Sequence, residues 1–182
     1  FTEVKRILAK TDGNCKPNFN PYVTDEDGNS IFHYMVLNAP LDETNLSEMH
    51  FFEPRAQIIK NKDQETPFLF ALKHNRAAVI RGHYLGALES GKFKTDEFEE
   101  FLRDYKVLLQ YLAQYFRDQE CIAELFKVLQ IEVNQEWFTE IDVNNMPIHT
   151  ALIHNNQAFL SVLFEKQALL EQLTRQTTLK NE

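Results

Sequence analysis

The chain repeats one short pattern, in which a polar turn leads directly into an apolar segment with helical spacing. Its three copies span residues 25–33, 61–69 and 142–149. Aligned on Ser30, Thr66 and Met146, the copies lie 36 and then 80 residues apart, and 80 is about two units of 40. Internal repetition at this spacing predicts an array of similar structural units, so the first functional question is which partner the array binds.

The second and third copies carry strong signals for a helix start. Thr66 is a good N-cap because its hydroxyl can accept from the amides of the first turn. Pro67 and Pro147 suit the first helical position, where a missing N–H costs nothing. The apolar residues that follow share one helical face in each copy: Phe68, Ala71 and Leu72, then Ile148, Ala151 and Leu152. Second helices are predicted at 77–88 and 157–164, and such hairpins must stack to hide their apolar faces.

The second and third copies also match residue by residue. The shared residues are Pro67, Ala71, Leu72, His74 and Asn75 against Pro147, Ala151, Leu152, His154 and Asn155. This pattern resembles the ankyrin repeat, whose signature is a turn, then Thr-Pro-Leu-His, an alanine and a second helix. The resemblance implies an all-α fold, an ankyrin-type α-solenoid of helical hairpins with an irregular helical insertion. Repeats would lie near 25–60, 61–91 and 142–173 in a single domain, 1–182, that is a fragment of a longer chain. A generic array of helical hairpins is the alternative.

The copies depart from the ankyrin signature in ways that predict irregular repeats. Ile31 replaces proline, Leu69 replaces histidine and Met146 replaces threonine. In ankyrin repeats the threonine and histidine side chains bond to nearby backbone and tie adjacent turns together, so these units should be held less regularly. His33 and His149 occupy the histidine position of the repeat, and the resemblance implies a structural hydrogen bond for each of them.

Residues 95–130 lack the turn signature but have strong helical periodicity. Apolar residues recur at three- and four-residue steps from Phe98 to Phe116, which predicts an amphipathic helix of about six turns. A break is expected at 117–119, followed by a second helix with Ile122, Leu125 and Phe126 on one side. Together they predict a helical hairpin that takes the place of a missing repeat.

Composition narrows the class of partner. The chain of 182 residues is 43% apolar, with 15 Phe, and carries a formal net charge of −8. This charge makes nucleic acid a poor partner. No apolar run approaches 18 residues, so membrane insertion is not expected. Cys15 and Cys121 lie far apart, which favours unpaired thiols in a reducing cytosol and a cytoplasmic location.

The sequence offers little support for metal, cofactor or catalytic chemistry. No two histidines have the i, i+4 spacing of a zinc-protease helix. A calcium loop around Gly28 fails, because it would place Val23 and Tyr34 at its first and twelfth ligand positions. No cofactor is therefore predicted. The remaining catalytic hypothesis is a cysteine-dependent enzyme, using Cys15 in a loop or Cys121 at a helix start with a histidine.

The resulting hypothesis is a protein–protein interaction module that presents its turn tips and inner helices to a partner. Its expected contact residues are Asp25, Asp27, Asn29, Tyr34, Asp63, Glu65, Phe70, Asp142, Asn144, Asn145 and Thr150. The composition resembles ankyrin-containing effectors that intracellular bacteria deliver into host cells, which implies a host protein as partner and the host cytosol as location. The alternatives are the cysteine-dependent enzyme and a structural spacer between flanking domains.

Overall fold

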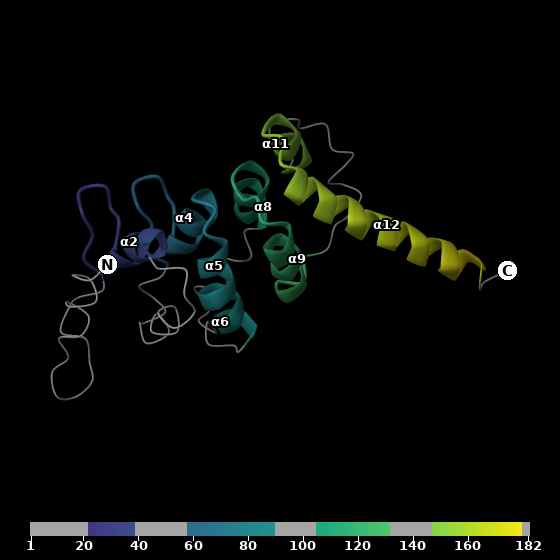
Figure 1. The fold of residues 1–182 in the computed structure, drawn as a ribbon, viewed down its shortest axis with the longest axis horizontal. Helices are drawn as coiled ribbons and strands as arrows, with labels where there is room; N and C mark the ends of the chain where they lie inside the picture. The colour runs from purple at the N-terminus through teal and green to yellow at the C-terminus, as the bar shows by residue number, and fades with distance from the viewer. Residues whose placement is uncertain (1–21, 39–57, 90–104, 132–146, 180–182) are drawn as a thin grey trace. The chain divides into compact units, whose positions relative to one another are not determined.

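The computed structural model describes residues 22–38, 58–89, 105–131 and 147–179 (Figure 1). Within these ranges every regular element is a helix, and the only β-type pairing is an isolated antiparallel bridge between Thr24 and Ser30. The all-α prediction is therefore confirmed for the described part of the chain. The contacts divide the chain into two compact units, Phe1–Asp104 and Tyr105–Glu182.

The first unit contains α2 (Ile31–Asn38), α4 (Pro67–Lys73), α5 (Ala77–Val79), a π-helix (Ile80–Leu85) and α6 (Gly86–Glu89). Thr66 caps α4 as predicted, since its Oγ1 accepts from the Leu69 amide at 3.3 Å, and Pro67 opens the helix. Helix α4 packs against α2. Arg76, at the start of α5, ties the following turn to α2 as well, because its Nε donates to the Val36 carbonyl in the last turn of α2 at 3.1 Å.

The second helix of this unit differs from the regular helix predicted over 77–88. A π-helical turn replaces the α-helix from Ile80 to Leu85. His83, Tyr84 and Leu85, which are consecutive in this wider turn, are all buried. Tyr84 is fully buried beside Phe68, with ring centroids 4.8 Å apart, and burial raises the pKa of its hydroxyl.

The second unit contains α8 (Tyr105–Gln114), α9 (Gln119–Val128), α11 (Pro147–Ile153) and α12 (Gln157–Leu179). Helix α8 packs against α11 and α9 against α12 (Figure 1). The predicted break at 117–119 is confirmed, because Asp118 caps α9 through a 2.9 Å bond from the Cys121 amide. The predicted start of the long helix at 95–104 lies outside the described residues. Helix α12 continues well past residue 164, where the sequence predicted its end.

The turns that join α4 to α5 and α11 to α12 have the same geometry, 80 residues apart. Asn75 and Asn155 adopt left-handed backbone angles, with φ of 52° and 49°. The Asn75 amide donates to the Leu72 carbonyl at 3.0 Å, and the Asn155 amide donates to the Leu152 carbonyl at 3.1 Å. Helices α2, α4 and α11 each begin directly after an aligned anchor, so the three predicted helix starts are confirmed. The arrangement of these hairpins as an ankyrin-type solenoid stays a prediction.

Candidate interaction surface

The first polar turn is organised by Asp25. Its Oδ1 accepts from the amides of Asp27 at 3.0 Å and Asn29 at 2.8 Å, while its carbonyl accepts from the Gly28 amide at 3.0 Å. Gly28 has a φ of +79°, a conformation that favours glycine. The carboxylate and the carbonyl of one residue therefore accept from three amides of the turn and fix its shape.

The second polar turn repeats this arrangement 36 residues later. Asn61 takes the place of Asp25, and its Oδ1 accepts from the Glu65 amide at 2.9 Å. Its carbonyl accepts from the Gln64 amide at 3.0 Å, and Gln64 has a φ of 63° where the first turn has glycine. The local polar pattern thus dictates the same turn twice.

The two turns are bonded directly to each other. The Lys62 amide donates to the Asp27 carbonyl at 2.9 Å, and Asn61 Nδ2 donates to Asn29 Oδ1 at 3.1 Å. The approach is close, because a Cβ added to Gly28 would lie 3.0 Å from the Lys62 nitrogen. These contacts hold the two tips in a fixed relation.

His33 adds a buried link between the turns, as the sequence predicted. Its Nδ1 accepts from the Ser30 amide at 3.0 Å, so the ring proton lies on Nε2, which donates to the Glu65 carbonyl at 2.9 Å. Burial lowers the pKa of His33, and the bond to the Glu65 carbonyl opposes that shift only in part. The neutral ring therefore fits both partners, because it can accept from the Ser30 amide and donate to the Glu65 carbonyl at the same time.

The corresponding link is not found at His149. Within the described part of the chain, its buried Nδ1 has no hydrogen-bond partner. The residue three positions before it is Met146, which has no hydroxyl where the first copy has Ser30. The histidine bond predicted from the resemblance is therefore confirmed at His33 only.

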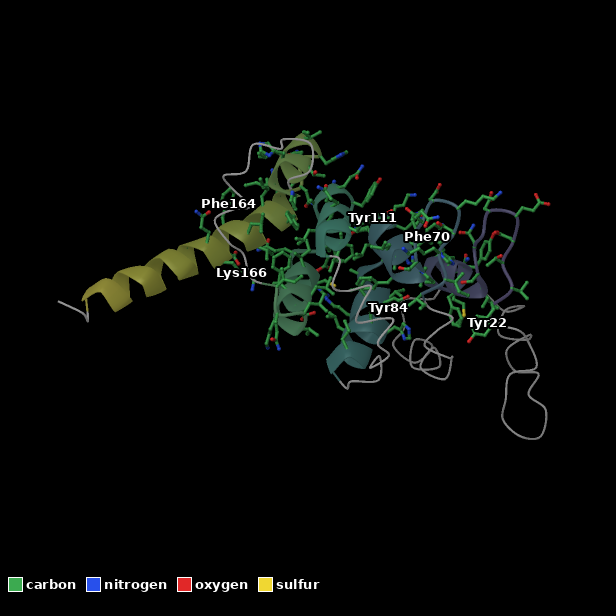
Figure 2. All side chains as sticks on the ribbon, turned by 180° about the vertical axis from the view of Figure 1, so that it is seen from behind. Tyr22, Phe70, Tyr84, Tyr111, Phe164 and Lys166 are labelled. Atoms are coloured by element: carbon green, nitrogen blue, oxygen red, sulfur yellow. The ribbon has the colours of Figure 1, made fainter. Side chains whose placement is uncertain are left out.

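We name the exposed part of these two turns, residues 25–27 and 62–64, together with Tyr34 and Phe70, the turn ridge. Tyr34 is 44% exposed and donates through its hydroxyl to Asp25 Oδ2, which lowers the pKa of Asp25 and raises that of Tyr34. Phe70, labelled in Figure 2, is half-buried. Its ring centroid lies 5.4 Å from that of His33 and 4.5 Å from that of His74.

One predicted contact residue is unsuitable. Glu65 is 1% exposed, and its carboxylate forms an ion pair with Lys73 at 2.7 Å. It therefore stabilises the second turn from inside and is not available to a partner. Glu26 and Lys62 are also exposed, at equivalent positions of the two turns. Lys62 was not among the predicted contact residues, although the 36-residue alignment pairs it with Glu26 in the first turn.

The other predicted contact residues do not all join this surface. Thr150 belongs to the second unit, where its hydroxyl donates to Gln110 Oε1 at 2.7 Å. Asp142, Asn144 and Asn145 lie outside the described residues. The first unit alone therefore brings together Asp25, Asp27, Asn29, Tyr34, Asp63 and Phe70.

The described residues give no support to catalytic or metal chemistry. Cys121 is fully buried, which keeps its sulfur from a substrate, and Cys15 lies outside the described residues. No cluster of metal-ligating side chains occurs within the described ranges. None of the helices in those ranges is both long and apolar enough to cross a membrane.

Comparison with known proteins gives no assignment for this geometry. No protein-family model matches the chain, and no curated protein or solved structure shows significant similarity to it.

Proposed function

We propose that the chain is a protein–protein interaction module of degenerate ankyrin-type hairpins, and that the turn ridge contacts the partner. The observation that carries this proposal is the direct bonding between the two turns through Lys62, Asp27, Asn61 and Asn29. The backbone of tips held in this way loses little conformational freedom on binding, so more of the contact energy appears as affinity.

The chemistry of the turn ridge favours a basic protein surface as its partner. Asp25, Glu26, Asp27 and Asp63 contribute four carboxylates, and Lys62 is the one cation among the ridge residues. The partly exposed ring of Tyr34 adds the aromatic contact area that is typical of interface centres. The same excess of carboxylates repels nucleic-acid phosphates.

Composition alone supports a secreted bacterial effector that binds a host protein in the host cytosol. The structural spacer and the cysteine-dependent enzyme are the competing functions, and the geometry of the turn ridge favours neither of them.

Photo-cross-linking tests the proposed binding surface. A benzophenone amino acid placed at Tyr34 should capture a specific protein from a cell extract. The same amino acid at Val107, which is 38% exposed in the second unit, is the matched control. Reversing the charge with Asp27→Lys should reduce the yield at position 34, because it repels a basic partner. If positions 34 and 107 captured proteins equally, the structural spacer would be the better explanation. The same would hold if Asp27→Lys left the capture at position 34 unchanged.

A further inference from the structure

The His33 ring lies buried between the two turns that form the turn ridge. Its Nδ1 accepts from the Ser30 amide, directly before α2, and its Nε2 donates to the Glu65 carbonyl of the second turn. One ring therefore joins the end of the first turn to the end of the second. This bonding needs a neutral imidazole, since a charged ring has two N–H donors and no acceptor.

A proton on Nδ1 would break one side of this link. The Ser30 amide would then face a second N–H at 3.0 Å, in a place where Ser30 is fully buried and water cannot replace the lost acceptor. The Ser30 hydroxyl, also 3.0 Å from Nδ1, can accept from the charged ring, but this leaves the amide unsatisfied. The charged ring therefore keeps its bond to the second turn and loses its acceptor role in the first.

The other two bonds between the turns are more accessible to water. One runs from the Lys62 amide to the Asp27 carbonyl, and both of these residues are exposed. The other runs from Asn61 to Asn29, which is half-buried. Bonds of groups that water can reach contribute little to stability, because water competes for the same donors and acceptors. The buried ring therefore has the largest influence on how firmly the two tips are held together.

Charged groups act on His33 from both turns. Asp25 and the Glu65 carboxylate favour the charged ring, whereas α2 itself contains no charged residue. Glu65 is paired with Lys73 of α4 at 2.7 Å, and this cation offsets part of its attraction. Burial has the largest effect and lowers the pKa of His33 below its ordinary 6.5, so the ring is neutral at pH 7 and becomes charged in acid.

His74 is the second histidine near this link, and it provides the control. It is exposed, and its ring contacts Phe70, which separates it from the His33 ring. His74→Gln therefore removes an acid-titrating ring from the same unit and leaves both bonds of His33 in place.

We propose that His33 makes the turn ridge a pH-sensitive surface, on which protonation of the ring loosens the first turn from the second and weakens binding of the basic partner. The binding part rests on the proposed function, whereas the loosening of the tips does not. The first copy alone has both residues of the link, because Leu69 replaces the histidine in the second copy and Met146 replaces Ser30 in the third.

NMR spectroscopy of the unsubstituted protein tests the loosening without a partner. The ring nitrogen shifts of His33 report its titration, and the scalar coupling across the bond from the Lys62 amide to the Asp27 carbonyl reports the contact between the tips. We expect this coupling to fall by roughly half or more as His33 becomes charged, because a longer bond couples less. The coupling from the Phe70 amide to the Thr66 carbonyl, at the start of α4, should stay unchanged and show that the unit remains folded.

Two variants assign the effect to one ring. His74→Gln should show the same fall at the same pH as the unsubstituted protein, whereas in His33→Gln the Lys62 coupling should no longer follow pH. A coupling that persists after His33 has become charged in the unsubstituted protein overturns the proposal. An equal fall in His33→Gln also overturns it, because the loosening would then have another cause.

Photo-cross-linking at position 34 tests the consequence for binding. Between neutral pH and the pH at which His33 is charged, capture should fall by about tenfold in the unsubstituted protein and in His74→Gln, but by less than about twofold in His33→Gln. A fall of the same size in His33→Gln would refute control of binding by this ring. If the tips loosen as expected but position 34 captures nothing at any pH, the proposed function fails and the pH-dependent loosening stands.

Discussion

Asn156 joins the two hairpins of the second unit, and its substitution gives a quantitative test of the fold. The side chain is fully buried. Its Nδ2 lies 2.8 Å from the carbonyl oxygen of Leu112, 2.9 Å from that of Ala113 and 2.8 Å from that of Phe116. Its Oδ1 accepts from the Phe159 amide at 3.1 Å, so one amide group closes the end of α8 and caps the start of α12.

The expected cost of Asn156→Ala follows from these bonds. The last carbonyls of a helix have no partner within it, and a buried carbonyl left without a donor costs about 1–3 kcal/mol. The amide has two protons, so the loss of two such bonds should cost about 2–6 kcal/mol, and loss of the N-cap adds about 1 kcal/mol. The total of about 3–7 kcal/mol is a large part of a typical domain stability of about 5–15 kcal/mol.

Denaturant unfolding followed by circular dichroism measures this cost, and Asn156→Asp separates its two parts. Aspartate keeps the oxygen that caps α12 but places a second oxygen against three carbonyl oxygens. It should therefore destabilise the second unit at least as much as alanine does. If Asn156→Asp unfolds at the same denaturant concentration as the unsubstituted protein, capping is the only role of the side chain and the reasoning is wrong.

Further predictions concern the first unit. Gly28→Ala should destabilise it by about 1–3 kcal/mol, because φ is +79° and the new Cβ would approach the neighbouring turn to 3.0 Å. Gly86→Ala is the matched control, helical with nothing within 4 Å, and should stabilise by about 0.5–1 kcal/mol in the same denaturation assay. The pKa of folded His33 lies below its ordinary 6.5, so the unfolded chain takes up this proton first, and the unfolding free energy should fall as pH drops below 6.5. The fall should be smaller in His33→Gln, and identical pH slopes would contradict this role of the ring. Tyr34→Phe should raise the pKa of Asp25 in an NMR titration, since it removes the hydroxyl that stabilises the carboxylate, and an unchanged pKa would show that the bond is absent in solution.

The features that could be predicted from the sequence are those decided within a few residues of the chain. Thr66 fixes the start of α4 through a local capping bond, and Pro67 supports it with a preset φ. Asp118 fixes the start of α9 through its own capping bond from the Cys121 amide. The π-helix was missed because it depends on packing: it brings consecutive residues around Tyr84 into the core, and no local signal marks it. Glu65 was misjudged for a related reason, since its burial depends on the ion pair with Lys73 in the next helix.

The turn ridge separates residues that hold the surface from residues that can contact a partner. Asp25 uses one carboxylate oxygen for two turn amides and the other for the Tyr34 hydroxyl. Asp27 contributes its backbone carbonyl to the link with Lys62, and within the described part of the chain no hydrogen bond to its exposed carboxylate is found. Asp25→Asn should therefore loosen the turn and lower stability, whereas Asp27→Asn should leave stability unchanged and reduce partner capture. Stability is measured by denaturation and capture by cross-linking at position 34. If Asp25→Asn reduced capture with no loss of stability, Asp25 would be a contact residue and this division of roles would be wrong.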